Sequence, residues 1–168
     1  MQRKLVSRIS KLASPILIVC GLLVAASPVW AAEKLVPFSG SLQALESIVS
    51  QSPGFFVADG SGGGIATLLG RFTLAWKFTV NTTDGTGSGP VRFTGANGDE
   101  IFTTAAGTSE PTDTPGVFRI VEIQTIIGGT GRFAGAKGSF TVERLTDLNT
   151  GFTSGSFHGA ITSPGSAQ

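Results

Sequence analysis

Apolar and polar residues alternate along much of the chain between residues 39 and 163, which predicts an all-β domain. The clearest case is the segment 71–81, where every second residue is apolar: Phe72, Leu74, Trp76, Phe78 and Val80. A period of two puts these side chains on one face of a strand and the intervening residues on the other face. No segment of useful length in this part of the sequence shows a helical period.

Turn residues divide this pattern into about eight predicted strands. Asn97-Gly98 marks one hairpin, because both residues tolerate a positive φ, and the segment 147–151 marks a second. The polar segments 82–90 and 107–116 are predicted to be long loops, either solvated connections or gates of a barrel mouth. The strands are expected at residues 38–46, 55–69 with a break at glycines 62–64, 71–81, 91–94, 101–105, 117–127, 138–145 and 152–161.

These strands are predicted to close into a single antiparallel up-and-down barrel that occupies residues 32–162. An open sheet of meandering strands would leave two unprotected edges, and pairing the first strand with the last removes both. A barrel of about eight strands has an interior that side chains nearly fill, with room for one small ligand. The segment that follows, residues 163–168, is predicted to be disordered.

Residues 1–31 are predicted to form a cleavable signal peptide. Basic residues precede the apolar run 16–26, and small residues lead to a cleavage site after Ala31. A retained anchor would need roughly 18 or more apolar residues, and this run is shorter. A lipoprotein would need a small residue before Cys20, where the chain has Val19. We therefore expect an exported protein, periplasmic or extracellular, with no stable membrane insertion.

Removal of the leader changes the charge of the protein. The leader holds four of the 12 basic residues and none of the 11 acidic ones, so eight basic residues remain and the net charge becomes −3. Without a cluster of lysine and arginine, the domain lacks a surface that would bind nucleic acid. The single cysteine leaves with the leader, which excludes disulfides, and the single histidine, His158, excludes a His-rich metal site.

A glycine-rich segment joins two of the predicted strands. Glycine is used where φ is positive or where another backbone comes close, so this segment is predicted to be a compact structural crossover. A phosphate-binding loop would be followed by a helix, whereas residues 139–142 have the pattern of a strand. A nucleotide site is therefore excluded, and no cofactor is predicted. The glycines of this crossover are Gly128, Gly129, Gly131, Gly135 and Gly138.

Extended to residue 140, this segment resembles a corner motif of the allene oxide cyclase and dirigent β-barrel superfamily, specifically of its secreted bacterial members. The segments 70–73, 96–99 and 153–157 also resemble motifs of these proteins, and the resemblance covers most of the chain from residue 62 onward. It implies a barrel around an apolar cavity. It also implies either cyclisation of an unsaturated fatty-acid epoxide or guidance of a stereoselective radical coupling. However, Glu46 is the only carboxylate in the first predicted strand and the chain has no tyrosine, so we expect a shared fold without the chemistry.

The predicted strand 117–127 carries the candidate catalytic residues Glu122 and Gln124, on one face with Phe118, Ile120 and Ile126. If this face lines the barrel, Glu122 would act as a general acid or base, and Gln124 would orient a carbonyl group or a water molecule. The alternative, which the sequence favours, is that the face points outward and both residues are solvated. The residues predicted to line a cavity are Phe72, Leu74, Trp76, Phe78, Phe93 and Glu122.

The sequence thus favours an exported small barrel that binds a small hydrophobic ligand or serves as a structural or interaction module. Both faces of the segment 117–127 carry apolar residues, which favours a homo-oligomer formed through an outer apolar face. The alternative is a cofactor-independent cyclase or isomerase that confines an unsaturated hydrophobic substrate in the barrel. The sequence leaves open whether the protein is an enzyme.

Overall fold

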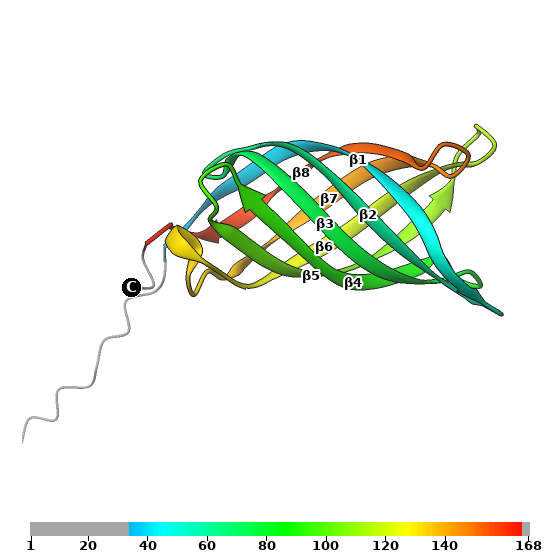
Figure 1. Ribbon diagram of the computed structural model, residues 1–168, viewed down its shortest axis with the longest axis horizontal. Helices are drawn as coiled ribbons and strands as arrows, with labels where there is room; N and C mark the ends of the chain where they lie inside the picture. Colours follow the sequence, from blue (N-terminus) through cyan, green and yellow to red (C-terminus); the bar gives the residue numbers. More distant parts are fainter. Residues whose placement is uncertain (1–33, 166–168) are drawn as a thin grey trace, which may run out of the picture. The chain divides into compact units, whose positions relative to one another are not determined.

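The computed structural model describes residues 34–165, and the predicted signal peptide at residues 1–31 lies outside this part. Eight antiparallel strands form a closed barrel, in which each strand pairs with its neighbours in sequence (Figure 1). The predicted fold class is therefore confirmed. The strands are β1 (Leu35–Ser52), β2 (Phe55–Ala66), β3 (Gly70–Asn81), β4 (Thr86–Gly95), β5 (Glu100–Pro111), β6 (Val117–Gly129), β7 (Gly138–Asp147) and β8 (Phe152–Thr162).

Pairing of β1 with β8 closes the barrel. The two strands are antiparallel over a register that runs from Leu35 opposite Thr162 to Leu45 opposite Phe152. Because β1 also pairs with β2 over the residues from Gly40 to Ser52, no strand of the described barrel is left as a free edge. Within residues 34–165 no helix has the length and apolar character needed to cross a membrane.

The two polar segments predicted as long loops are mostly strand. β4 begins at Thr86 and β5 continues to Pro111, so the connections are only residues 82–85 and 112–116. β2 likewise continues through glycines 62–64, where a break was expected. Glycine in these strands allows close packing: a Cβ at Gly107 would contact the backbone oxygen of Val121 on β6. The predicted loops are therefore correct in place but too long, because Gly87, Gly89 and Gly107 have the composition of loops and yet lie within strands.

Small side chains on β2 face large side chains on β3, and this pairing helps to fill the half of the barrel nearest to the β6–β7 crossover. The indole ring of Trp76 lies over Gly60, its register partner, and the ring of Phe72 lies against Gly64. Alternation of small and large residues between neighbouring strands allows a narrow barrel to be packed without voids. The small inward residues of β2 are Ala58, Gly60, Gly62, Gly64 and Ala66.

Replacing Gly64 by alanine is expected to destabilise the protein by about 1–3 kcal/mol, because an added methyl group would overlap the backbone oxygen of Ser41 on β1. The matched control is Gly87→Ala on β4, whose Cβ would meet only the Cγ2 atom of Val80, at 3.4 Å, and a more distant backbone oxygen. We expect the control to change stability by less than about 1 kcal/mol. Urea unfolding measures both, and equal unfolding midpoints for the two variants would contradict this packing argument.

An aromatic cluster closes one end of the barrel. Phe157 is at its centre, with ring centroids 5.1 to 6.2 Å from those of four other phenylalanines. These rings interdigitate at tilted and edge-on angles, which is how aromatic side chains pack most favourably. The cluster fills the interior of the barrel at this end. Its members are Phe38, Phe72, Phe93, Phe140 and Phe157.

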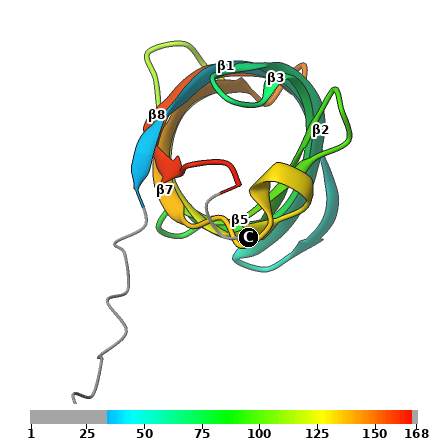
Figure 2. The ribbon, with the colours of Figure 1, turned by 90° about the vertical axis from the view of Figure 1, so that its left-hand side faces the viewer.

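The glycine-rich crossover between β6 and β7 lies over one side of this end of the barrel (Figure 2). It contains a single 3-10 turn, η1 (Gly131–Phe133), whose Phe133 is buried in the core. Gly131 and Gly135 have φ angles of 52° and 72°, which bend the chain back over the barrel. The sequence predicted a compact crossover here but did not predict that it packs a phenylalanine into the barrel end.

Hydrogen bonds fix this crossover to two neighbouring turns, the β2–β3 turn and the β4–β5 turn. Arg132 donates from Nε to Oδ2 of Asp99 at 2.8 Å and from Nη2 to the backbone oxygen of Leu68 at 3.1 Å. Hydrogen bonds from the side chains of Asn97 and Arg132 lower the pKa of Asp99, so this carboxylate is charged at neutral pH.

The segment 163–168, predicted to be disordered, begins with ordered residues. The backbone amides of Ser163 and Gly165 donate to the backbone oxygens of Lys34 and Arg132, each at 2.9 Å. The ordered chain therefore extends beyond β8 to Gly165, and residues 166–168 lie outside the described part.

Candidate functional site

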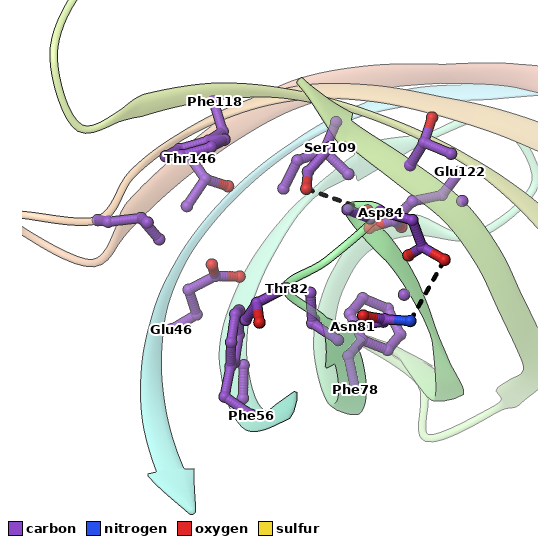
Figure 3. A pocket seen from close by; sticks show the side chains of 18 of the residues that line it. Glu46, Phe56, Phe78, Asn81, Thr82, Asp84, Ser109, Phe118, Glu122 and Thr146 are labelled. Atoms are coloured by element: carbon purple, nitrogen blue, oxygen red, sulfur yellow. Dashed lines mark hydrogen bonds between the residues drawn. The ribbon is translucent and has the colours of Figure 1, made fainter. Parts of the chain in front are cut away.

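The end of the barrel opposite η1 contains a cavity of about 490 Å³ (Figure 3). Its walls are largely apolar and come from β2, β3, β4, β5 and β6, and its mouth is bordered by the loop 82–85. Cavities of roughly 300–1,000 Å³ with apolar walls and a few polar groups are typical of sites for small molecules. The apolar side chains of the walls include Phe56, Ala58, Phe78, Val80, Phe118 and Ile120.

Arg144, on β7, is the centre of a polar network at the floor of this cavity. Its Nε and Nη2 atoms donate to Oε1 of Glu122, on β6, at 3.1 and 2.9 Å. Its Nη1 atom donates to Oε2 of Glu46, on β1, at 3.1 Å. The side chain of Arg144 is only 5% exposed, so both ion pairs are shielded from solvent. We call Arg144, Glu46 and Glu122 the floor triad.

Neighbouring polar side chains complete the network. Gln124 donates to Oε2 of Glu122 at 3.0 Å and accepts from the hydroxyl group of Thr103 at 2.6 Å. Nη1 of Arg144 also lies 2.7 and 3.0 Å from the hydroxyl oxygens of Thr146 and Thr153. Both oxygens of Glu122 are thus engaged by partners within the protein, as buried charged groups require.

Trp76 forms the layer between the floor triad and the aromatic cluster. The guanidinium carbon of Arg144 lies 5.3 Å from the centroid of its ring, within the range of a cation–π contact. The indole Nε1 of Trp76 is buried and has no hydrogen-bond partner among residues 34–165. Gly155, the register partner of Arg144 on β8, allows the two strands to approach closely, since an added Cβ would overlap the backbone oxygen of Glu143 and crowd the Cβ of Arg144.

The structure corrects the orientation that the sequence favoured for Glu122 and Gln124. Both residues point into the barrel, and they are 6% and 2% exposed. The outward face of β6 instead carries Ile123 and Ile127, which are exposed. Because both faces of this strand carry apolar residues, its period of two could not show which face points into the barrel.

Only two of the six predicted lining residues, Phe78 and Glu122, line the cavity. Trp76 lies beneath its floor, and Phe72, Leu74 and Phe93 belong to the buried core. They lie deeper than expected because the aromatic cluster and the floor triad together fill the closed half of the barrel.

Sequence reasoning did not identify Arg144 and noted Glu46 only as an isolated carboxylate. A signal for Arg144 is present, since it follows Phe140 and Val142 at a spacing of two and so continues the buried face of β7. A charged residue on an otherwise apolar face indicates a buried partner of opposite charge. No pattern in the sequence indicates which carboxylates these partners are.

The loop 82–85 is held in place at the mouth of the cavity. The backbone oxygen of Gly85 accepts hydrogen bonds from the amide and hydroxyl groups of Ser109, at 2.9 and 3.1 Å. Asp84 accepts from the hydroxyl and amide groups of Thr86, and these hydrogen bonds lower its pKa. Asp84 therefore adds a negative charge at the cavity rim.

Groups able to bind a metal are not found together in the described part of the chain. Within residues 34–165, no three side chains from histidine, cysteine, aspartate or glutamate cluster closely enough to hold an ion.

No model of a known protein family matches this chain, and no curated protein is significantly similar to it in sequence. The superfamily resemblance carried by the glycine-rich motifs therefore stays a prediction. The geometry of the cavity is the basis for a functional proposal.

Proposed function

We propose that this protein is an exported binding protein for a small apolar molecule, which it holds in the cavity opposite η1. The observation that supports this proposal is the cavity itself: about 490 Å³, with apolar walls and a polar floor at one end. Such a site can bury most of a small ligand while a few polar groups set its orientation. The export part of the proposal depends on the predicted signal peptide.

The arrangement of Glu122 favours binding over catalysis. A cyclase or isomerase would need an acid or base that can exchange a proton with its substrate. Both oxygens of Glu122 already accept hydrogen bonds from Arg144 and Gln124, so this carboxylate is committed to the protein. The catalytic alternative is therefore the weaker one for this cavity.

An interaction role is a second candidate, supported by apolar side chains on the outer face. Leu45 and Phe152 are register partners on β1 and β8, and they are 61% and 44% exposed. Leu145, on the next strand, is also exposed. Association of copies through these residues is compatible with ligand binding inside the barrel.

Filling the cavity is expected to abolish binding of apolar probes. The variant Gly87→Leu adds a side chain to the cavity wall at a position where a Cβ has room. The matched control, Ser88→Leu, places the same side chain on the outer face of the same strand. We expect the neutral dye N-phenylnaphthylamine to bind wild type and the control alike and to bind Gly87→Leu at least about tenfold more weakly, a loss of about 1.4 kcal/mol.

Dye fluorescence measures these affinities, and native mass spectrometry of the purified protein reports any retained small molecule together with the number of subunits. Equal dye binding by Gly87→Leu and Ser88→Leu would place the dye outside the cavity and contradict the proposal.

A further inference from the structure

The floor triad contains two carboxylates and one guanidinium. Arg144 uses Nε and one hydrogen of Nη2 for Glu122 and offers Nη1 to Glu46. Nη1 also lies within hydrogen-bond distance of the hydroxyl groups of Thr146 and Thr153. These hydroxyl groups compete with Glu46 for the two hydrogens of Nη1. Glu46 is therefore the less compensated carboxylate, and the floor has one more negative charge than positive.

One oxygen of Glu46 is free to contact a ligand. Oε2 accepts from Arg144, whereas Oε1 has no hydrogen-bond partner among residues 34–165. Glu46 extends from β1 into the cavity (Figure 3), although its side chain is only 11% exposed. Because Oε1 is open to the cavity and not fully buried, a donor group on a ligand can reach it.

The rest of the cavity also favours positive charge. Among residues 34–165, Arg144 is the only basic residue that lines it, while Asp84 adds a carboxylate at the rim. Three phenylalanines in the walls, Phe56, Phe78 and Phe118, supply aromatic rings, whose faces attract cations. A molecule that carries a negative charge would meet repulsion at both the rim and the floor.

We propose that the ligand is an amphiphilic amine, with an apolar body along the cavity walls and an ammonium group that donates to Oε1 of Glu46. An ammonium group has three N–H donors and one positive charge, so its binding would balance the charge of the floor triad. This inference rests on the proposed function of the cavity. It assigns Glu46 as the residue that selects the charge of the ligand.

Three probes with the same alkyl chain test this assignment: decylamine, decanol and decanoate. Each is titrated against the complex of wild-type protein with N-phenylnaphthylamine, and displacement of the dye is measured. We expect decylamine to bind at least about tenfold more tightly than decanol, and decanoate to bind most weakly.

The variant Glu46→Gln should reduce the preference for decylamine over decanol to within about twofold. The glutamine can still accept from Arg144, which then pairs one to one with Glu122, so the fold is expected to persist. The matched control is Glu143→Gln, which removes the same charge from the outer face of β7 and should keep the preference.

The outcomes separate the two proposals. Equal binding of decanol and decylamine by wild type would overturn the amine assignment while the binding function stands, as would an unchanged preference in Glu46→Gln. If the dye and all three probes fail to bind wild type, or bind Gly87→Leu equally well, the proposed function is wrong as well.

Discussion

Replacing Arg144 by methionine is expected to lower the free energy of unfolding by about 3–5 kcal/mol, because it leaves Glu46 and Glu122 as buried carboxylates without a counter-charge. Methionine retains much of the apolar volume of arginine, so the loss would come from charge and hydrogen bonding more than from packing. Urea unfolding followed by the fluorescence of Trp76, whose ring contacts Arg144, measures the effect directly.

Two further variants test this explanation. In the triple variant Arg144→Met, Glu46→Gln, Glu122→Gln, no unpaired charge remains, and most of the lost stability should return. Arg119→Met breaks an exposed ion pair with Glu143 and is expected to cost less than about 1 kcal/mol. A small loss in Arg144→Met, similar to that in Arg119→Met, would show that the floor triad is not held by its charges.

The aromatic cluster should give an equally large effect at the other end of the barrel. Phe157→Ala is expected to destabilise the protein by about 3–5 kcal/mol, since it removes the ring that contacts four other phenylalanines and leaves a cavity. Phe152→Ala, on the same strand, removes a ring that is 44% exposed and should cost far less. Equal losses in the two variants, measured by thermal or urea unfolding, would contradict the central role of Phe157.

The barrel was predictable from the alternation of apolar and polar residues, because one face of each strand points into the barrel and the other faces solvent. The segment 71–81 shows this clearly. Four of its five alternating apolar residues are buried on the inward face of β3, and the fifth, Val80, is half-buried near the end of the strand. Loop lengths were not predictable in the same way. Glycines at 87 and 107 have the composition of a loop, yet they lie opposite each other inside a ladder, where they allow close approach of strands.

The candidate site was only partly visible in the sequence. Glu122 and Gln124 were identified as candidates, but their orientation depends on the partner strand, where Arg144 supplies the opposite charge. Glu46 lies 98 positions from Arg144 along the chain, and the closure of the barrel brings them together. Contacts of this kind depend on three-dimensional register, which a single sequence does not encode in any local pattern.

The aromatic cluster closes the end of the barrel beneath η1, so the cavity has one opening, and a bound molecule would have to leave through it. An elongated ligand whose charged group contacts the floor triad would pass the loop 82–85 with that group first, and its apolar tail would lie nearest to the solvent. Under the proposed function, the ligand would therefore enter and leave through the same opening. Ligands with different head groups would be distinguished at the floor triad, and ligands with tails of different length would be distinguished at the mouth of the cavity.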